Sequence, residues 1–200
     1  NFINIHVGLV IKDDEHLEKS VKKYFEENAE SKTITFWDTT NVKDMSYSFS
    51  YRFDFNTLLL WNVTNVKNMH SMFDNCKNFN QELNSWNVCN VENMIGMFHR
   101  CEKFNQKLNK WNVSSVTQME GMFDSCKEFN QHLNSWNVSN VQNMRFIFKD
   151  CRNFNQPLDN WNVGFVKNMN GMFTRCKNFN QPLNKWDVSN VTNMEGMFAD

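Results

Sequence analysis

Hydrophobic side chains recur along most of this chain with a period of about 25 residues. Tryptophan marks the period, because one spacing of 24 residues is followed by spacings of 25, at Trp37, Trp61, Trp86, Trp111, Trp136, Trp161 and Trp186. The other apolar positions repeat as well, and one unit carries Leu108, Trp111, Val113, Val116, Met119, Met122, Phe123, Cys126 and Phe129. A fixed period of this length is typical of solenoids, whose units bury their apolar residues against one another.

Within one unit the hydrophobic period changes. Trp111 and Val113 alternate with polar residues, which favours a short strand with one buried face. From Val116 to Cys126 the apolar residues lie three or four positions apart, which favours a short helix. We therefore predict coils of strand, turn, short helix and return loop. Glycine recurs in the predicted helix, where we expect its missing side chain to let neighbouring helices approach, at Gly96, Gly121, Gly171 and Gly196.

The first residues do not follow the repeat. Phe2–Ile11 alternates loosely, as a strand does, and Asp13 and Asp14 supply N-cap residues for a helix over about residues 14–29. One face of that helix is apolar, with Leu17, Val21, Tyr24 and Phe25. We predict that residues 1–35 form a cap over the first coil, because terminal elements of solenoids must shield an open apolar end. Residues 36–200 then form about six and a half coils.

The charge balance argues against several classes of partner. The net charge is −1 and 22% of the residues are charged, so no strongly basic surface is predicted for nucleic acid or anionic membranes. No apolar run approaches the length of about 20 residues that spans a membrane, so direct membrane insertion is not expected. The chain begins without methionine and stops at Asp200, one position before the next cysteine of the repeat. We interpret it as a piece of a longer protein.

The cysteines follow the same register. Most of the six occupy one apolar repeat position, which predicts small buried thiols, at Cys76, Cys101, Cys126, Cys151 and Cys176. Disulfides between coils or a metal ladder are the alternatives, but the chain has no Cys-x-x-Cys pair and no matching histidine spacing. Cys89 replaces a serine or threonine of the other units, so we expect it to be exposed. Unpaired thiols favour a reducing compartment.

Other residues capable of chemistry are scattered. The histidines share no register, so neither a metal site nor an acid–base cluster is predicted, at His6, His16, His70, His99 and His132. The recurring Asn-Gln pairs, such as Asn130 and Gln131, are interpreted as a structural ladder of amides. We therefore predict no catalytic residues, no cofactor and no enzymatic activity.

The unit Phe129–Cys151 follows, with small changes, the pattern Phe-Asn-Gln-x-Leu-Asn-x-Trp-Asn-Val-Ser-Asn-Val-x-x-Met-x-Gly-Met-Phe-x-x-Cys, and Phe179–Phe198 fits it best. This pattern resembles the 25-residue repeat of the BspA-like leucine-rich-repeat surface proteins, also known from mycoplasma lipoproteins. The resemblance covers about residues 34–200. It implies an α/β, leucine-rich-repeat-like solenoid used for recognition, often as an adhesin on cell surfaces. Related repeats also occur in large DNA viruses and protists.

Candidate binding residues follow from the outward positions and from breaks in the repeat. The polar position after each tryptophan should lie on the strand face, and Asn112, Asn137 and Asn162 either form a solvated ladder or the floor of a recognition surface. Phe146 stands where most units have glycine, and Phe165 where most have asparagine. Each is either packed locally or displayed as an interaction anchor.

The sequence thus predicts a non-enzymatic protein-binding module of unknown partner. The adhesin-like interpretation implies that the protein lies on a cell surface. The alternative is a structural component of a viral particle or an intracellular assembly, which the unpaired cysteines favour.

Overall fold

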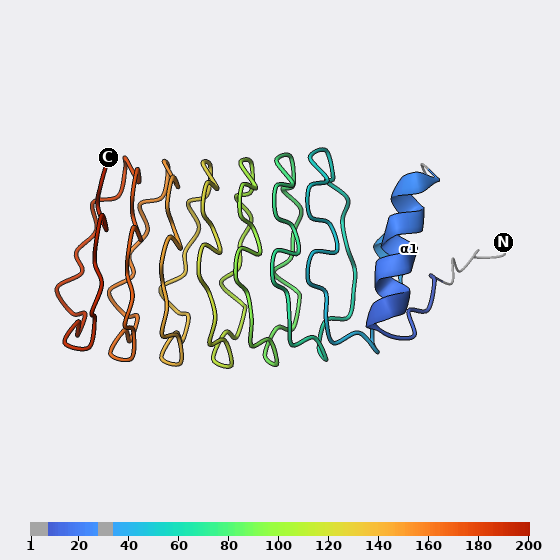
Figure 1. The fold of residues 1–200 in the computed structure, drawn as a ribbon, viewed down its shortest axis with the longest axis horizontal. Helices are drawn as coiled ribbons and strands as arrows, with labels where there is room; N and C mark the ends of the chain where they lie inside the picture. The colour runs from blue at the N-terminus through green and yellow to red at the C-terminus, as the bar shows by residue number, and fades with distance from the viewer. Residues whose placement is uncertain (1–7, 28–33) are drawn as a thin grey trace.

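The structure is a computed structural model that describes residues 8–27 and 34–200. The chain winds into coils that stand side by side in a row, with helix α1 (Asp14–Glu26) at one end and the C-terminus at the other (Figure 1). Successive coils are joined by isolated parallel β-bridges at one register, from Asp44↔Asn68 to Asn168↔Asn193. The predicted stacking of repeated units is therefore present.

Helix α1 covers the first coil, as its amphipathic pattern predicts. The Asp13 side chain accepts a hydrogen bond from the backbone N–H of His16 at 2.8 Å, which caps the N-terminus of the helix. Leu17 and Val21 are buried, and the ring of Phe25 packs 6.3 Å from that of Phe49. Asp14 accepts hydrogen bonds from the backbone N–H groups of residues 43 and 44, which ties the helix to the coil.

The described helix ends at Glu26, and residues 28 and 29 of the predicted helix lie outside the described residues. Residues 2–7 of the predicted N-terminal strand lie outside them as well. The remainder of that segment pairs in parallel with the start of the first coil, through the bridge Val10↔Asp38. A single 3-10 turn, η1 (Ile34–Phe36), precedes this bridge partner.

The predicted short helices of the coils are wrong, because α1 and η1 are the only helices in residues 8–27 and 34–200. The segment from Met119 to Cys126 is instead a run of turns, in which successive amides alternate between two kinds of acceptor. The N–H of Gly121 donates to Arg145 of the next coil at 2.9 Å, whereas that of Met122 donates back to Met119 at 3.3 Å. Each turn is closed by an N–H that donates to the carbonyl three residues earlier, and this spacing resembles the inward spacing that suggested a helix.

The predicted position of the strand is also wrong. Trp111 and Val113 belong to no strand, and the bridges between coils lie further along, at Gln118↔Asn143 and its equivalents. The relation of these coils to leucine-rich repeats stays a prediction.

Aromatic stacks run through the core from coil to coil. The rings of Trp111 and Trp136 lie 6.3 Å apart and nearly parallel, at 3°. Phe98 and Phe123 stack at 5.8 Å, and Phe104 and Phe129 at 6.0 Å. The tryptophan N–H groups are satisfied too, since Trp136 Nε1 donates to the carbonyl of Leu108 at 3.1 Å. The two phenylalanine columns are thus continuous stacks from the first coil to the last.

The recurring glycine has a backbone role that the sequence analysis missed. Gly121 has a φ of +59°, in the left-handed region that side chains disfavour. The same register position holds Tyr47, Ser71 and Phe146 in other coils, with φ of +57°, +51° and +58°. The glycine therefore meets a conformational demand of the turn, and the expected contact between helices does not exist.

Candidate functional site

The Asn-Gln ladder holds the coils together, as predicted. Asn130 Oδ1 accepts hydrogen bonds from Asn155 N and Gln156 Nε2 of the next coil, each at 2.9 Å. The N–H of Asn130 in turn donates to Asn105 Oδ1 at 2.9 Å. Because these amides are engaged with neighbouring coils, they belong to the scaffold.

The repeated cysteines are buried, as predicted, and each thiol donates to a backbone carbonyl of the preceding coil. Cys126 Sγ lies 2.9 Å from the carbonyl oxygen of Phe98. Burial raises the pKa of Cys76 and of Cys176 to about 12, and raises the pKa of Cys101, Cys126 and Cys151 well above the ordinary value. These thiols stay protonated at neutral pH and are poor nucleophiles. Cys89 is half-buried, although we expected it to be exposed.

The candidate asparagines lie at a turn and not on a strand face. Asn112, Asn137 and Asn162 are exposed, and each side-chain oxygen accepts the backbone N–H two residues further on, at 3.1, 3.2 and 3.1 Å. Such a bond shapes the turn locally. The asparagines therefore line one corner of successive coils, and their oxygens serve the backbone.

Phe165 is displayed beside this corner. Its side chain is 67% exposed. In most other coils the same position carries an amide that donates to a carbonyl of the preceding coil, as Asn140 does to Ser114 at 2.7 Å and Asn190 to Gly164 at 2.8 Å. A phenylalanine cannot make that bond, so Phe165 gives up a contact between coils and leaves its ring in solvent.

Phe146 is packed locally, unlike Phe165. Its ring is half-buried, with the guanidinium carbon of Arg145 at 4.3 Å and Lys149 Nζ at 4.8 Å from the centroid. It also occupies the space beside Gly171, since a Cβ on that glycine would lie 2.4 Å from the ring. This ring is therefore covered by its own neighbours, which weakens the expectation that it serves as an anchor.

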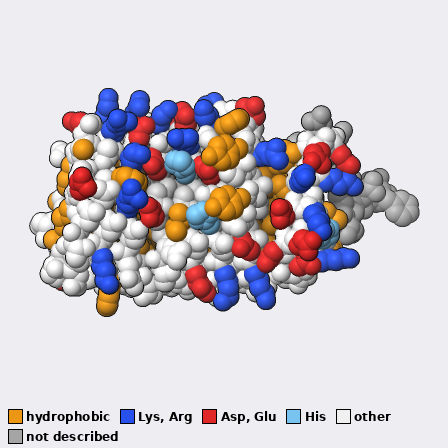
Figure 2. Space-filling model, viewed as in Figure 1, with side chains coloured by type: hydrophobic (Ala, Val, Ile, Leu, Met, Phe, Trp, Pro, Cys, Tyr) orange, Lys and Arg blue, Asp and Glu red, His pale blue; other side chains and the backbone are white. Residues whose placement is uncertain are grey.

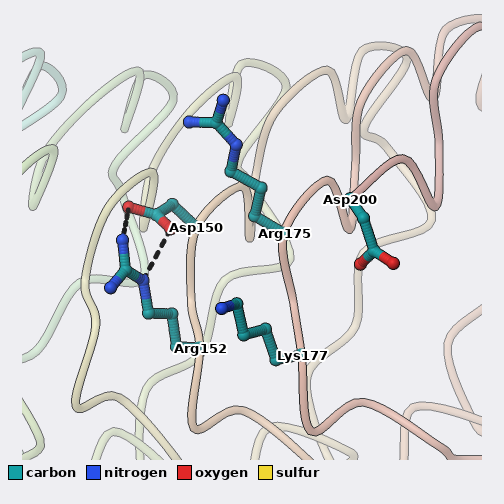
Figure 3. Close-up of a pocket in the computed structure, with 5 residues that line it drawn as sticks. All are labelled: Asp150, Arg152, Arg175, Lys177 and Asp200. Carbon is teal, nitrogen blue, oxygen red and sulfur yellow. Dashed lines mark hydrogen bonds and ion pairs between the residues drawn. The ribbon is translucent and has the colours of Figure 1, made fainter.

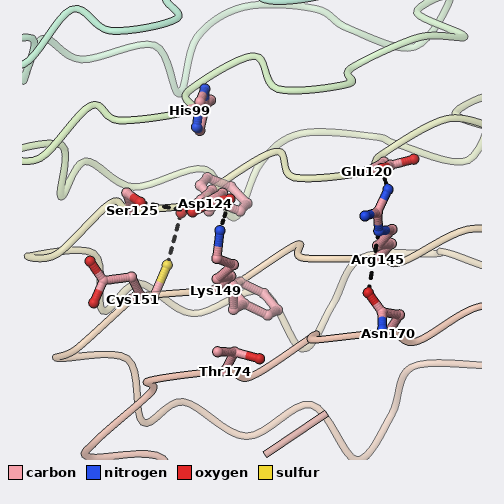
Figure 4. Close-up of polar contacts among 12 residues, drawn as sticks. His99, Glu120, Asp124, Ser125, Arg145, Lys149, Cys151, Asn170 and Thr174 are labelled. Atoms are coloured by element: carbon pink, nitrogen blue, oxygen red, sulfur yellow. Dashed lines mark hydrogen bonds and ion pairs between the residues drawn. The ribbon is translucent and has the colours of Figure 1, made fainter. Parts of the chain in front are cut away.

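Ion pairs hold the two cations of this cluster in place. Arg145 Nη1 donates to Glu120 Oε1 of the preceding coil at 3.2 Å, and Arg145 Nε donates to Asn170 Oδ1 of the following coil, also at 3.2 Å (Figure 4). Lys149 lies 3.3 Å from Asp124 (Figure 4). The half-buried ring and its cations thus bridge three coils.

Sequence reasoning missed a group of exposed aromatic residues on the first coil. The first coil carries an aromatic side chain at every second position from Tyr47 to Phe55, and Phe49 and Phe55 are buried. Tyr47, Tyr51 and Phe53 are exposed instead, at 57%, 60% and 48%. The repeat register could have revealed the first of these, because it occupies the glycine position.

A cavity of about 590 Å³ lies at the last coils and is lined by Asp150, Arg152, Arg175, Lys177 and Asp200 (Figure 3). The Arg152 side chain is engaged by Asp150, with Nε at 2.9 Å from Oδ1. The lining side chains come from the outward positions of successive coils. This hollow is a gap between charged surface residues, and it concentrates no reactive group.

A cluster of metal ligands and a membrane-spanning helix are both absent from the part of the chain that the structure describes. No three histidine, cysteine, aspartate or glutamate side chains gather as metal ligands among residues 8–27 and 34–200. No helix there has the length and apolar character needed to cross a membrane.

Comparison with known proteins identifies one family. A sequence model of that family, described as a Mycoplasma protein of unknown function, DUF285, matches residues 19–127 and again residues 106–200. Neither the curated proteins nor the solved structures include a significant match. The repeat coils described above fall within the matched segments, and two overlapping matches are expected of a tandem repeat. The chain therefore belongs to the family described as Mycoplasma protein of unknown function, DUF285.

Proposed function

We propose that this chain is a non-enzymatic recognition module that binds a protein partner, as the resemblance of its repeat to the BspA-like surface proteins implies. Its side chains divide into two classes. The inward columns and the Asn-Gln ladder hold the coils together, whereas some outward positions, such as that of Phe165, depart from the repeat. Scaffolds of this kind present extended surfaces for binding.

One observation carries the proposal, namely the display of Phe165. A ring that is 67% exposed replaces an asparagine whose equivalents bond to the neighbouring coil. An apolar aromatic side chain in solvent gains from burial against a partner, and aromatic residues are enriched among those that dominate interfaces. The adjacent corner of Asn112, Asn137 and Asn162 supplies a polar rim around this anchor.

The adhesin-like role is the form of this proposal that the resemblance favours. In that role the partner is a protein of another cell or of its matrix, and the long row of coils presents the Phe165 corner to it. The protonated, carbonyl-bonded thiols fit a binding scaffold, because they offer neither a nucleophile nor a free metal ligand.

The test begins with capture of the partner at the proposed anchor. A photo-crosslinking amino acid at position 165 should trap a protein from host-cell surface extract. The same group at Ser115, which occupies the equivalent position in an earlier coil, should not trap it. The trapped protein is then purified and its affinity for the chain is measured directly.

Phe165→Asn then separates binding from folding. The substitution restores the residue of the neighbouring coils and allows a hydrogen bond to the Ser139 carbonyl, so the melting temperature should stay equal or rise. Affinity should fall by about 10-fold or more, as expected for a central aromatic anchor worth about 1.4 kcal/mol or more. Unchanged affinity for the purified partner would show that binding occurs elsewhere.

A further inference from the structure

The exposed aromatic residues of the first coil form a surface that the packing of the cap does not use. Tyr47, Tyr51 and Phe53 constitute this first-coil aromatic surface. The ring of Tyr47 lies 4.8 Å from that of His70, and the rings of Tyr51 and Phe53 lie 6.4 Å apart. Figure 2 shows hydrophobic side chains gathered beside histidines on this face of the molecule, toward the end that carries α1.

Tyr47 is placed at a position that suits glycine. Its φ is +57°, in the register where Gly96, Gly121 and Gly171 have φ of +56°, +59° and +58°. A bulky side chain in this region strains the backbone. Burial of the ring does not offset the strain, because the side chain is 57% exposed.

Phe146 shows how the same chain covers an aromatic ring at that register position. Arg145, one residue before it, and Lys149, three residues after it, place cations 4.3 and 4.8 Å from the ring centroid. Carboxylates of the preceding coil hold both cations in place. The result is a cation–π cluster closed by ion pairs.

The first coil has an aromatic ring, Tyr47, at this register position but has no cations at the two positions that flank it. The positions equivalent to Arg145 and Lys149 are Ser46 and Ser50. Other rings of this region do carry cations, since Arg52 lies 4.3 Å from the centroid of Phe25, and Lys77 lies 5.5 Å from that of Phe53. Within residues 8–27 and 34–200 no cation lies over Tyr47.

Carboxylates line the same groove as Tyr47. A groove of about 620 Å³ runs between α1 and the first coil, and its lining includes Tyr47, Glu15, Glu18 and Asp44. Burial raises the pKa of Asp44, but hydrogen bonds from Ser46 and Asn68 together outweigh it and lower this pKa, so the carboxylate is ionised at neutral pH.

The groove lining holds two cations, Lys22 and Arg52, against four carboxylates, so its charge is net negative. Lys22 Nζ lies 3.9 Å from Glu26, and the Arg52 guanidinium lies on Phe25. Glu18 is exposed and forms no ion pair with any residue that the structure describes. The groove therefore combines an aromatic ring that is 57% exposed with negative charge, which complements a cation from outside.

We propose that this groove binds an arginine side chain of a protein partner, with the guanidinium stacked on Tyr47 and its charge facing Glu18 and Asp44. Arginine fits better than lysine because its planar guanidinium stacks on aromatic rings and also bonds carboxylates. The partner's guanidinium would cover the ring and pair with a carboxylate, as the Arg145 guanidinium does at Phe146 within the chain. This surface is distinct from the Phe165 corner, since the two lie several coils apart.

The probe is an acetylated, amidated heptapeptide with two arginines in a glycine-serine background, titrated into the 200-residue chain and followed by amide NMR shifts. Saturable shifts are expected at Ser46 and Tyr47 and not at Arg145 or Phe146. A peptide with citrulline in place of arginine has the same shape without the charge, and it should produce no saturable shift.

Two variants at the same register position form a matched pair. Tyr47→Gly removes the ring and relieves the backbone, so the protein stays folded while the Kd for the arginine peptide rises by roughly three- to tenfold. Phe146→Gly removes the other ring and should leave this Kd unchanged. In a third variant, Ser46→Arg with Ser50→Lys, the chain's own cations should cover Tyr47 and abolish peptide binding.

Three results would each overturn the proposal. They are equal binding of the citrulline peptide, an unchanged Kd in Tyr47→Gly, and the absence of saturable shifts in the unmodified chain at millimolar arginine peptide. The experiment is independent of Phe165, because Phe165→Asn should bind the arginine peptide as tightly as the unmodified chain does.

Discussion

Replacing Asn130 by alanine removes one oxygen that two donors of the next coil share. Asn130 Oδ1 accepts from Asn155 N and from Gln156 Nε2, each at 2.9 Å. The Gln156 side chain is able to rotate toward water, but the backbone N–H of Asn155 is fixed by the stacked turn. Leaving such a group unsatisfied in the folded state costs about 1–3 kcal/mol. Because these residues are only half-buried, we expect the lower part of this range.

The C-terminal coil of the described chain offers a matched control. Asn180 N donates to Asn155 Oδ1 at 2.9 Å, but its own side-chain oxygen accepts no hydrogen bond from the described residues. Asn180→Ala keeps the backbone donor and removes nothing that another coil uses. Its cost should stay within about 0.5 kcal/mol, as for an ordinary surface substitution.

Urea unfolding followed by circular dichroism and by tryptophan fluorescence measures both variants, and coincident curves establish that a single transition is compared. Asn130→Ala should lower the unfolding free energy by about 1–2 kcal/mol more than Asn180→Ala. At about 2–4 °C per kcal/mol for a chain of this size, the melting temperature should fall by roughly 2–8 °C. Equal stability of the two variants would refute the assignment of the Asn-Gln ladder as the link between coils.

Two further predictions concern the backbone and the thiols. Gly121→Ala should lower the unfolding free energy by about 1 kcal/mol in thermal or urea unfolding. The cause is backbone strain and not a clash, because φ is +59° and the nearest atom to an added Cβ is 3.9 Å away. An unchanged stability would contradict this. In the folded protein the pKa of Cys76 and of Cys176 is raised from the ordinary value of about 9 to about 12. The unfolding free energy should therefore fall as the pH rises from about 9 toward 12, because the unfolded chain loses these thiol protons first. A stability profile that is flat from pH 9 to 11 would mean that the thiols are not buried as described.

The buried set of the coils was readable from the sequence because it depends only on a repeated register. Trp111, Val116 and Cys126 are all buried, as the 25-residue period predicts. The cap was readable for the same reason, since Leu17 and Val21 follow a helical spacing behind an aspartate N-cap. These features follow from apolar spacing and local capping, which a single chain displays directly.

The backbone of the coils was not readable, because two conformations share one hydrophobic spacing. A helix places Met119 and Met122 inward, and so does a run of turns in which an N–H donates to the carbonyl three residues earlier. What distinguishes them is the acceptor of each amide, and half of the acceptors lie in the next coil, as for Gly121 and Arg145. A pairing at a separation of about 25 residues leaves no mark on local propensity.

The candidate site divides in the same way. The sequence identified Phe165 as a break in an outward column but left open whether its ring is packed or displayed, and the structure shows the ring exposed. The packing of Phe146 required knowledge that Arg145 and Lys149 fold over the ring, and their contacts depend on the left-handed turn. Tyr47 was missed because the recurring glycine at its register position was attributed to close contact between helices and not to a positive φ.

Departures from the repeat carry the functional information because the repeat itself is accounted for by stacking. A departure that the chain covers with its own side chains, such as Phe146, changes only how coils pack. A departure that costs a bond or strains the backbone and still leaves its ring in solvent, such as Phe165 or Tyr47, receives no compensation within the described chain. Since an uncompensated cost persists only when another contact offsets it, these two rings are the places where a partner is expected to add what the coils lack.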